Sequence, residues 1–264
     1  MKTEDQLIVT LERGVKCITF NRPERRNAIT LEMFEAFAEA VERSETDGTR
    51  VVVLTGAGDA FCSGLDISTV ASGDLARLDV AQTLRDLINP PILRMRSLSV
   101  PFIARVHGPV GGIGFSYVLA SDVRVGSTAS TFGQTFITVG LMPDGGSTYF
   151  LSRLVGPAKA YELMATGARL DAAEAQRLGV LNRVVPFTEL DAAVEEVVSC
   201  LASAPQPALA HVKRSLTLAE HDELAAALEY EADGQAECFR SADFREGVTA
   251  FMQKRTPAFG QDRD

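Results

Sequence analysis

The sequence is poor in several residue types that mark particular classes of protein. Its 264 residues include no tryptophan, three histidines and four cysteines. The cysteines at positions 17, 62, 200 and 238 show no CxxC spacing and no histidine cluster nearby. Neither a metal site nor a disulfide framework is therefore expected, and the thiols are predicted to be reduced and mostly buried.

Positive charge is also in short supply. Lysine and arginine number 26 against 35 acidic residues, which gives a formal net charge of −9. Nucleic acids and acidic membrane surfaces attract proteins through positive potential, so we expect neither as a partner. A few placed basic side chains could still hold a small phosphorylated ligand, so the net charge excludes little about small molecules.

Long apolar segments are absent as well. No apolar run reaches the roughly 20 residues that a helix needs to cross a bilayer, and residues 1–6 are charged and lack the apolar segment of a secretory signal. We therefore expect a cytoplasmic protein. The composition is otherwise ordinary, with 46% hydrophobic residues available for a core.

The predicted strands lie in the first part of the chain. Residues 7–11 and 15–20 alternate in hydrophobicity on either side of Arg13-Gly14 and predict a β-hairpin. Residues 51–54 and 101–106 are almost wholly apolar, which is typical of strands buried on both faces. A further strand is predicted at residues 122–125.

The predicted helices alternate with these strands and then replace them. Thr30 is suited to cap a helix, and residues 75–96 are helical in pattern with a break or kink expected at the prolines of residues 89–91. Further helices are predicted up to residue 120 and over residues 171–178, 188–204 and most of 207–255. We therefore predict an α/β core over residues 1–195 that carries the site, followed by a helical oligomerisation region over residues 196–264.

Two glycine-rich loops follow buried strands. Gly64-Leu65 comes after the strand at residues 51–54, and Gly111-Gly112-Ile113 comes after the strand at residues 101–106. Such loops bind ligands in α/β sheets, and the helix that the second loop opens has free N–H groups in its first turn. Two N–H groups aimed at one point would form an oxyanion hole that stabilises an enolate. Alternatively, both loops are tight turns whose glycines only permit close packing.

Other catalytic fingerprints fail. The sequence has no phosphate-binding P-loop, residues 112–117 lack the last glycine of a dinucleotide motif, and Ser116 lacks the second glycine of a nucleophile elbow. The three histidines show no metal-ligand spacing. Hydrolase triads and metal catalysis are unsupported.

Motifs spread along the whole chain carry a family resemblance. They are NRPERRNA at residues 21–28, AFCSGLD at 60–66, VHG at 106–108, GGIG at 111–114 with Asp122, FGQ at 132–134, GLMPDGG at 140–146, LVG at 154–156 and EGVTAFMQKR at 246–255. In this order they resemble the motifs of the enoyl-CoA hydratase/isomerase (crotonase) family.

The resemblance implies a crotonase spiral of ββα units with a C-terminal helical trimerisation region, assembled as a homotrimer or a dimer of trimers. The substrate would be an acyl-CoA thioester, with coenzyme A as part of the substrate and no prosthetic group or metal. The N–H groups of Leu65 and Ile113 would form the oxyanion hole. The resemblance places Arg26, Ala28, Ser63, Leu65, Asp66 and Ile67 at the coenzyme A site, joined by Phe251 and Lys254 from a neighbouring subunit. It also places Gly112, Ser116, Phe136 and Met142 in the substrate pocket, and Asp66 is interpreted mainly as an acceptor that organises its loop.

The sequence departs from the family at two catalytic positions. Hydratases of this family carry glutamates where this chain has Ser116 and Phe136. Hydration needs two positioned acid/base groups, so efficient hydratase activity is predicted to be absent. Asp144 remains at a family catalytic position, and one carboxylate suffices to shift a double bond from a 3-enoyl-CoA to a 2-enoyl-CoA. Apolar neighbours such as Phe136 would raise the pKa of Asp144.

Several alternatives remain open from the sequence. Asp144 could instead cap a helix that begins near Gly146. The enzyme could be an enoyl-CoA hydratase of fatty-acid β-oxidation, or a dehalogenase-like relative in which Asp144 is a nucleophile, although no histidine lies in the stretch expected for its base. It could also be an acyl-CoA-binding paralogue without catalysis. Chain length, ring character and pathway of the substrate are not encoded in any motif.

Overall fold

The computed structural model describes residues 6–68, 79–218 and 220–260. The main sheet of the described residues has the strand order β1-β2-β3-β4-β6-β9. The first two strands are antiparallel and all later pairs are parallel. The strands are β1 (Leu7–Glu12), β2 (Val15–Phe20), β3 (Val51–Gly56), β4 (Phe102–Val106), β6 (Val123–Ser127) and β9 (Arg183–Val185). The predicted hairpin and the three predicted strands that follow it are therefore confirmed.

The central strand β3 is buried on both faces, as its sequence predicts. All six of its residues are buried. Val51 and Val53 pack in one apolar cluster with α10 (Leu190–Ser203), whereas Val52 and Leu54 belong to the main core on the opposite face. Successive side chains of a strand point to opposite faces, so an uninterrupted apolar run requires cover on both sides.

A second, smaller sheet contains three short strands that the sequence pattern did not predict. They are β5 (Pro109–Gly111), β7 (Thr131–Gly133) and β8 (Arg169–Asp171), in the order β5-β7-β8. At three residues each, they are too short for a recognisable alternation. Strand β5 matters for the site because it ends in the second glycine loop.

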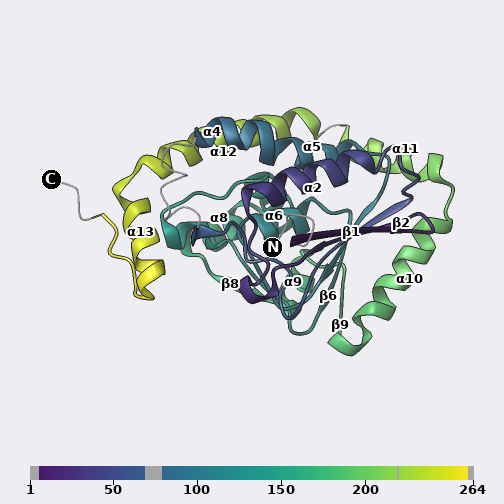
Figure 1. Cartoon of the computed structure of the whole chain (residues 1–264), viewed down its shortest axis with the longest axis horizontal. Helices are drawn as coiled ribbons and strands as arrows, with labels where there is room; N and C mark the ends of the chain where they lie inside the picture. The colour runs from purple at the N-terminus through teal and green to yellow at the C-terminus, as the bar shows by residue number, and fades with distance from the viewer. Residues whose placement is uncertain (1–5, 69–78, 219, 261–264) are drawn as a thin grey trace.

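Four helices lie side by side over one face of the main sheet (Figure 1). They are α2 (Leu31–Arg43), α4 (Val80–Thr83), α5 (Asn89–Ser97) and α12 (His221–Arg240). Thr30 caps α2 as predicted, since its side chain accepts a hydrogen bond from the Met33 N–H. The other face of the sheet is covered by α10.

The helix does not end at residues 89–91, and the kink or break predicted there appears as a change of helix type just before the prolines. A π-helical segment, η3 (Leu84–Ile88), joins α4 to α5, and Pro90 and Pro91 lie in the first turn of α5. The wider turn lets the Asn89 N–H donate to the Leu84 carbonyl group and shifts the hydrogen-bond register before the two prolines, which have no N–H to donate. The start of the predicted helix, residues 75–78, lies outside the described residues.

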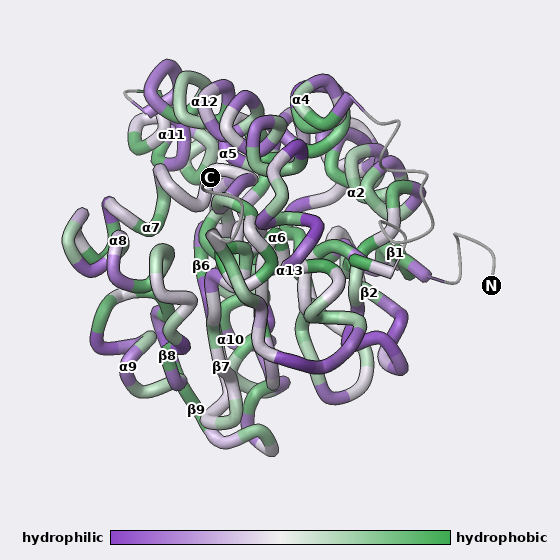
Figure 2. Tube along the Cα trace, turned by 90° about the vertical axis from the view of Figure 1, so that its left-hand side faces the viewer, coloured by the Kyte–Doolittle hydropathy of each residue, from purple (hydrophilic) through white to green (hydrophobic). Residues whose placement is uncertain are grey.

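The C-terminal helices are part of the same body as the sheet. Leu224 and Leu228 of α12 belong to the main hydrophobic core, so α12 packs on its own chain. The boundary predicted between residues 195 and 196 falls inside α10. Figure 2 shows α4, α11 (Gln206–Thr217) and α12 along one edge, with hydrophilic and hydrophobic colours alternating as in amphipathic helices.

The remaining helices connect these layers. They are η1 (Pro23–Arg25), α6 (Ile113–Ala120), η4 (Thr135–Val139), α7 (Ser147–Val155), α8 (Pro157–Thr166), α9 (Ala172–Arg177), η5 (Phe187–Glu189) and α13 (Ala242–Gln253). Within the described residues, no helix combines the length and apolar character needed to cross a membrane.

Candidate active site

The first glycine loop is held in place by a buried asparagine. Asn27 is fully buried with a positive φ of 57°. Its Nδ2 donates to the carbonyl groups of Ala57 and Ala60 at 2.9 and 2.7 Å, and its Oδ1 accepts from the Arg22 N–H. An amide side chain can satisfy several backbone groups at once because it has donors and acceptors. The NRPERRNA and AFCSGLD motifs therefore meet through Asn27.

The two glycine loops lie against each other. Cys62 and Val110 form a parallel bridge, and the Gly111 N–H donates to the Cys62 carbonyl group at 2.9 Å. A methyl group on Gly64 would lie 3.2 Å from the Gly111 carbonyl oxygen. Gly64 also has a φ of +103°, which other residues rarely adopt. Glycine is thus required here for both conformation and close approach.

This arrangement leaves two backbone N–H groups available beside each other. The Ile29 N–H donates to the Gly64 carbonyl group, and the Ile29 carbonyl group accepts from the Asp66 N–H. The N–H of Leu65, which lies between Gly64 and Asp66, therefore points away from Ile29. Ile113 is the first residue of α6, where N–H groups have no intrahelical acceptor. Among the hydrogen bonds of the described residues, neither N–H has an acceptor. The pair has the arrangement expected of an oxyanion hole.

Leu65 and Ile113 open into a cavity of about 550 Å³. Much of the wall is apolar and comes from α2, α4, η3 and η4, with Phe34, Leu84 and Phe136 among its side chains. A cavity of this size and character suits a small organic ligand. Its acidic lining residues, within the described part of the chain, are Glu24, Asp66 and Asp144.

Asp144 is a buried acidic residue of this wall. Its residue exposure is 7%, and its carboxyl group is held by Gln235, whose Nε2 donates to Oδ2 at 2.8 Å. The other oxygen, Oδ1, is buried without a hydrogen-bond partner among the described residues. Burial raises the pKa of Asp144 from 3.8 to about 7, while the Gln235 hydrogen bond acts in the opposite direction. Asp144 is therefore poised to exchange a proton near neutral pH.

Asp144 does not cap a helix. Helix α7 begins at Ser147, its N-cap is Gly146, and no side chain bonds to its first turn from that position. The loop instead turns closely against α6, since a methyl group on Gly145 would lie 2.2 Å from Ile113 Cδ1. The capping alternative is therefore wrong, and the Asp144 loop lies beside Ile113, whose N–H group is predicted to contribute to an oxyanion hole.

Ser116 supports this loop from behind the cavity. It is fully buried, donates to the Asp144 carbonyl oxygen at 2.8 Å and shares a hydrogen bond of 2.7 Å with the Ser147 hydroxyl group. Gln134 donates to the same Ser147 hydroxyl group at 3.0 Å. Ser116 was predicted to line the pocket, but it is not among the lining residues because its hydroxyl group points into this network.

Helix α12 supplies two residues that the sequence analysis missed. Besides bonding to Asp144, Gln235 accepts the Met142 N–H at 3.2 Å. Glu231 lies one turn earlier, is fully buried and accepts hydrogen bonds from the N–H groups of Gly146 and Thr148 at 2.7 and 3.0 Å. Burial raises the pKa of Glu231 to about 7, and the charge of Asp144 also raises it. One signal was present, because both residues continue the apolar helical stripe that includes Leu224 and Leu228.

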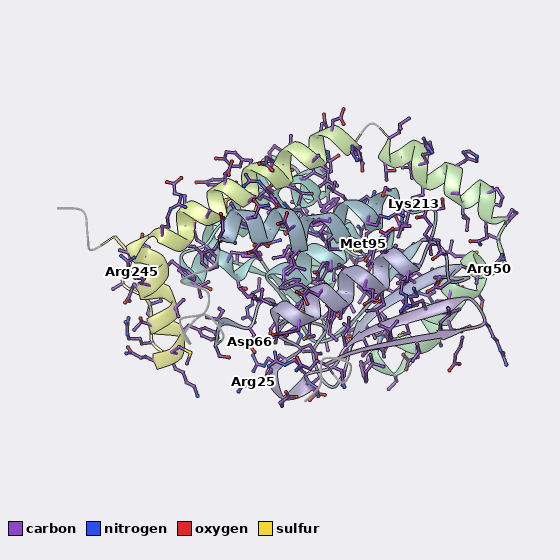
Figure 3. The ribbon with its side chains drawn as sticks, turned by 45° about the horizontal axis from the view of Figure 1, so that its top comes forward. Arg25, Arg50, Asp66, Met95, Lys213 and Arg245 are labelled. Atoms are coloured by element: carbon purple, nitrogen blue, oxygen red, sulfur yellow. The ribbon has the colours of Figure 1, made fainter. Side chains whose placement is uncertain are left out.

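The mouth of the cavity carries most of the residues expected to bind coenzyme A. Arg26, Ala28, Ser63, Leu65, Asp66 and Ile67 all line it. Asp66 organises its loop as predicted: its carboxylate accepts from the Ser68 N–H at 3.1 Å and forms an ion pair with Arg22 at 2.8 Å. Burial opposes ionisation, but the Ser68 and Arg22 interactions outweigh it and lower the pKa of Asp66. Figure 3 shows Asp66 and Arg25 beside the ribbon of α2, on the side toward α13.

The predicted site also includes Phe251, Lys254 and Met142. Phe251 of α13 lines the cavity of its own chain. Lys254 is exposed beyond the end of α13 and lies off the wall of its own chain's cavity, and the contribution of both residues to a neighbouring subunit's site stays a prediction. Met142 is also absent from the cavity wall, because its sulfur faces Gly234 of α12. Gly112 and Phe136 do line the cavity.

Comparisons with known proteins agree with this geometry. Residues 10–262 match the enoyl-CoA hydratase/isomerase family profile. A probable enoyl-CoA hydratase of Rhodobacter capsulatus is 36% identical over 94% of this chain and 95% of its own length. The 1,2-epoxyphenylacetyl-CoA isomerase of Escherichia coli is 35% identical over 94% of this chain and 96% of its own length. A crystal structure of an enoyl-CoA hydratase from Mycobacterium avium subsp. paratuberculosis has a TM-score of 0.88 at 36% identity and covers 97% of this chain and 99% of that one. The chain therefore belongs to the enoyl-CoA hydratase/isomerase family and has the crotonase fold that its motifs predicted.

Proposed function

We propose that the protein is an acyl-CoA isomerase that converts a 3-enoyl-CoA into a 2-enoyl-CoA, with Asp144 as its acid and base. The observation that carries this proposal is the state of Asp144: a buried carboxyl group with one free oxygen and a pKa of about 7, on the wall of a cavity that also exposes two backbone N–H groups. The substrate would be held as a coenzyme A thioester, with no metal or prosthetic group taking part.

The proposed reaction needs no second acid or base. The Asp144 carboxylate takes a proton from C2 of the 3-enoyl thioester, and the electrons delocalise into a dienolate with negative charge on the thioester oxygen. The N–H groups of Leu65 and Ile113 donate to that oxygen. The protonated Asp144 then returns the proton to C4, which restores the thioester carbonyl and leaves the double bond between C2 and C3. Neither water nor an electron carrier is consumed.

Two other buried carboxylates near Asp144 are already engaged in contacts that leave them unsuited to activate water. Asp66 is engaged by Arg22 and Ser68, and Glu231 is engaged by Gly146 and Thr148 and lies off the cavity wall. A hydratase must hold and deprotonate a water molecule while the α-carbon is protonated, which normally needs a second positioned group. The relatives include proteins named as hydratases and one named as an isomerase, so the chemistry of the site decides our proposal.

We also propose that the protein assembles as a homotrimer or a dimer of trimers. Helix α11 supports association because it exposes Val212, Leu216 and, at its end, Leu218, with exposed fractions of 57%, 65% and 69%. Exposed apolar side chains grouped in this way are typical of surfaces that another subunit covers. Analytical ultracentrifugation tests this proposal: a monomer at micromolar concentration would contradict it.

The test of function is a parallel assay of the wild type and Asp144→Ala with 3-enoyl-CoA and 2-enoyl-CoA substrates. The proposal predicts turnover of the 3-enoyl thioester that collapses in the variant, and little hydration of the 2-enoyl thioester by either protein. Matching thermal unfolding curves would show that the variant is folded. Efficient hydration by both proteins would overturn the proposal.

A further inference from the structure

The contacts of Gln235 fix which way its amide group faces. Its Oε1 receives the Met142 N–H at 3.2 Å, and a backbone N–H can only donate. The Nε2 group must therefore face Asp144, to which it donates at 2.8 Å. Gln235 is 1% exposed, so water does not compete for these bonds. The amide is thus a fixed donor aimed at one oxygen of the acid.

This donor decides where Asp144 can carry a proton. Asp144 Oδ2 accepts a hydrogen bond from Gln235 Nε2. A proton on Oδ2 that faced Nε2 would place two hydrogen-bond donors against each other, and they would repel. The proton of the neutral acid is therefore confined to Oδ1, the oxygen that has no partner among the described residues. A proton carried there is not held by a hydrogen bond to any described residue.

Glu231 holds the remainder of the loop in register with this contact. Its carboxylate receives the N–H groups of Gly146 and Thr148, together with the Thr148 hydroxyl group at 2.5 Å. Because Glu231 and Gln235 lie four residues apart on α12, they face the loop from the same side of the helix. One helix therefore fixes the loop on both sides of Asp144.

We propose that Gln235 is a positioning residue for proton transfer, which locks Asp144 Oδ2 and so confines the transferred proton to Oδ1, with Glu231 fixing the loop. This inference rests on the proposed function of Asp144 as the acid and base. It assigns a role in that reaction to α12, a helix that lies outside the motifs of the two glycine loops. The residue acts through Asp144 and need not touch the substrate.

The groups that face Asp144 predict a direction for the effect. They are Gln235 and Glu231 from α12 and Tyr117 from α6, whose own pKa is raised by burial and also by the charge of Asp144. Among the described residues, no cation contributes to the pKa of Asp144. The Gln235 donor is thus the stabilising contact of the carboxylate, and without it a higher pH is needed to ionise Asp144.

The test is the pH profile of kcat/KM for a 3-enoyl-CoA in the wild type, Gln235→Leu and Gln235→Glu. The rate should rise with pH as Asp144 ionises, and the midpoint of that rise should move up by about one pH unit in Gln235→Leu. It should move further in Gln235→Glu, a nearly isosteric change that places a second carboxyl group against Asp144. The matched control is Asn89→Leu, which removes a likewise buried amide side chain that donates to the Leu228 carbonyl group of α12 and not to the Asp144 loop, and its midpoint should stay at the wild-type value.

The outcomes separate this inference from the proposed function. If both Gln235 variants fold but lose rate equally at every pH without a shift, Gln235 is merely structural and the inference fails. The nearly isosteric Gln235→Glu alone can decide the question if Gln235→Leu does not fold. If Asp144→Asn keeps wild-type turnover, the proposed function itself fails, whatever the Gln235 variants do.

Discussion

The two walls of the cavity are built in different ways. The backbone wall, residues 60–66 and 109–113, offers N–H groups whose positions depend on glycines and on a strand bridge. The side-chain wall, residues 141–146 with α12, offers a carboxyl group whose properties depend on burial and on two distant side chains. The backbone wall can stabilise negative charge in one fixed state, whereas the side-chain wall must change its protonation state during turnover.

This difference teaches where the energetic cost of the site lies. The backbone wall places free N–H groups next to a ligand cavity. The side-chain wall keeps two carboxyl groups, Asp144 and Glu231, largely out of water, and burial raises the pKa of both to about 7. Buried carboxylates destabilise a fold when they ionise. Substitutions that remove a buried carboxyl group from the side-chain wall should therefore raise the free energy of unfolding, and substitutions in the backbone wall should not.

The largest effect is expected from Asp144→Asn, which removes the acid and base but keeps an acceptor for Gln235. Turnover should fall by about 10³-fold, as expected for loss of a positioned acid/base. The free energy of unfolding should rise by about 2 to 4 kcal/mol above pH 7, where the wild type carries the penalty of a buried carboxylate. Steady-state kinetics and urea unfolding at about pH 8 measure the two effects.

The sign of the stability effect follows from the raised pKa. The unfolded Asp144 ionises near its ordinary value of 3.8 and the folded one at about 7. The wild type therefore loses the stability that this group contributes as pH rises between these values. Over the same range of pH, the free energy of unfolding of Asp144→Asn rises relative to that of the wild type. Below about pH 4 the two proteins should be equally stable. An equal stability at pH 8 would show that Asp144 is not a buried, destabilising carboxyl group.

The next largest effect is expected from Gly112→Ala in the backbone wall. Gly112 has a φ of +51°, a conformation in which alanine is strained, and an added methyl group would lie 3.4 Å from the Gly64 Cα atom, in ordinary contact. The strain should displace the Ile113 N–H and lower kcat by about 10²-fold, with about 1 to 3 kcal/mol of lost stability. Gly179→Ala is the control, since Gly179 has a φ of +78° with no atom within 4 Å of the added methyl group. Equal losses of kcat in both variants would contradict the role assigned to the backbone wall.

A smaller effect is expected from Thr148→Val in the side-chain wall. The change removes one donor to Glu231 while the N–H groups of Gly146 and Thr148 remain bonded to it. We expect a loss of about 1 kcal/mol in the free energy of unfolding, and turnover within about two-fold of the wild type. Thr249→Val, on the exposed side of α13, is the control and should change stability by less than about 0.5 kcal/mol. A large loss of turnover in Thr148→Val would mean that Glu231 does more than hold the loop.

The two walls also differ in how far the sequence predicts them. The two N–H groups of Leu65 and Ile113 could be picked out because each follows a buried strand and a glycine loop in a recognisable motif. Asp144 could be picked out from its motif, and its raised pKa was expected from apolar neighbours, but its contact with Gln235 could not be foreseen. Gln235 and Glu231 were missed because they lie about 90 residues after the loop, on a helix whose neighbour no local pattern identifies.

The same limit applies to the larger arrangement. The central strands β3 and β4 were predicted because their residues are apolar on both faces, and local preference agrees with the fold there. The three-residue strand β9 of the same sheet was not predicted. Phe251 can line the cavity of its own chain or that of a neighbour, depending on the direction of α13 relative to the core. That direction is a property of the tertiary structure. The short strands of the second sheet carry too few residues to show a pattern.

The most direct measurement of the central claim follows the proton itself. A 3-enoyl-CoA deuterated at C2 is converted by the wild type in ordinary water, and the product is examined by NMR for deuterium at C4. Because Asp144 Oδ1 is shielded from solvent, one carboxyl group that carries the isotope from C2 to C4 should deliver a substantial fraction of it to the product. Product that carries only solvent protons at C4 would contradict a single shielded aspartate as both acid and base.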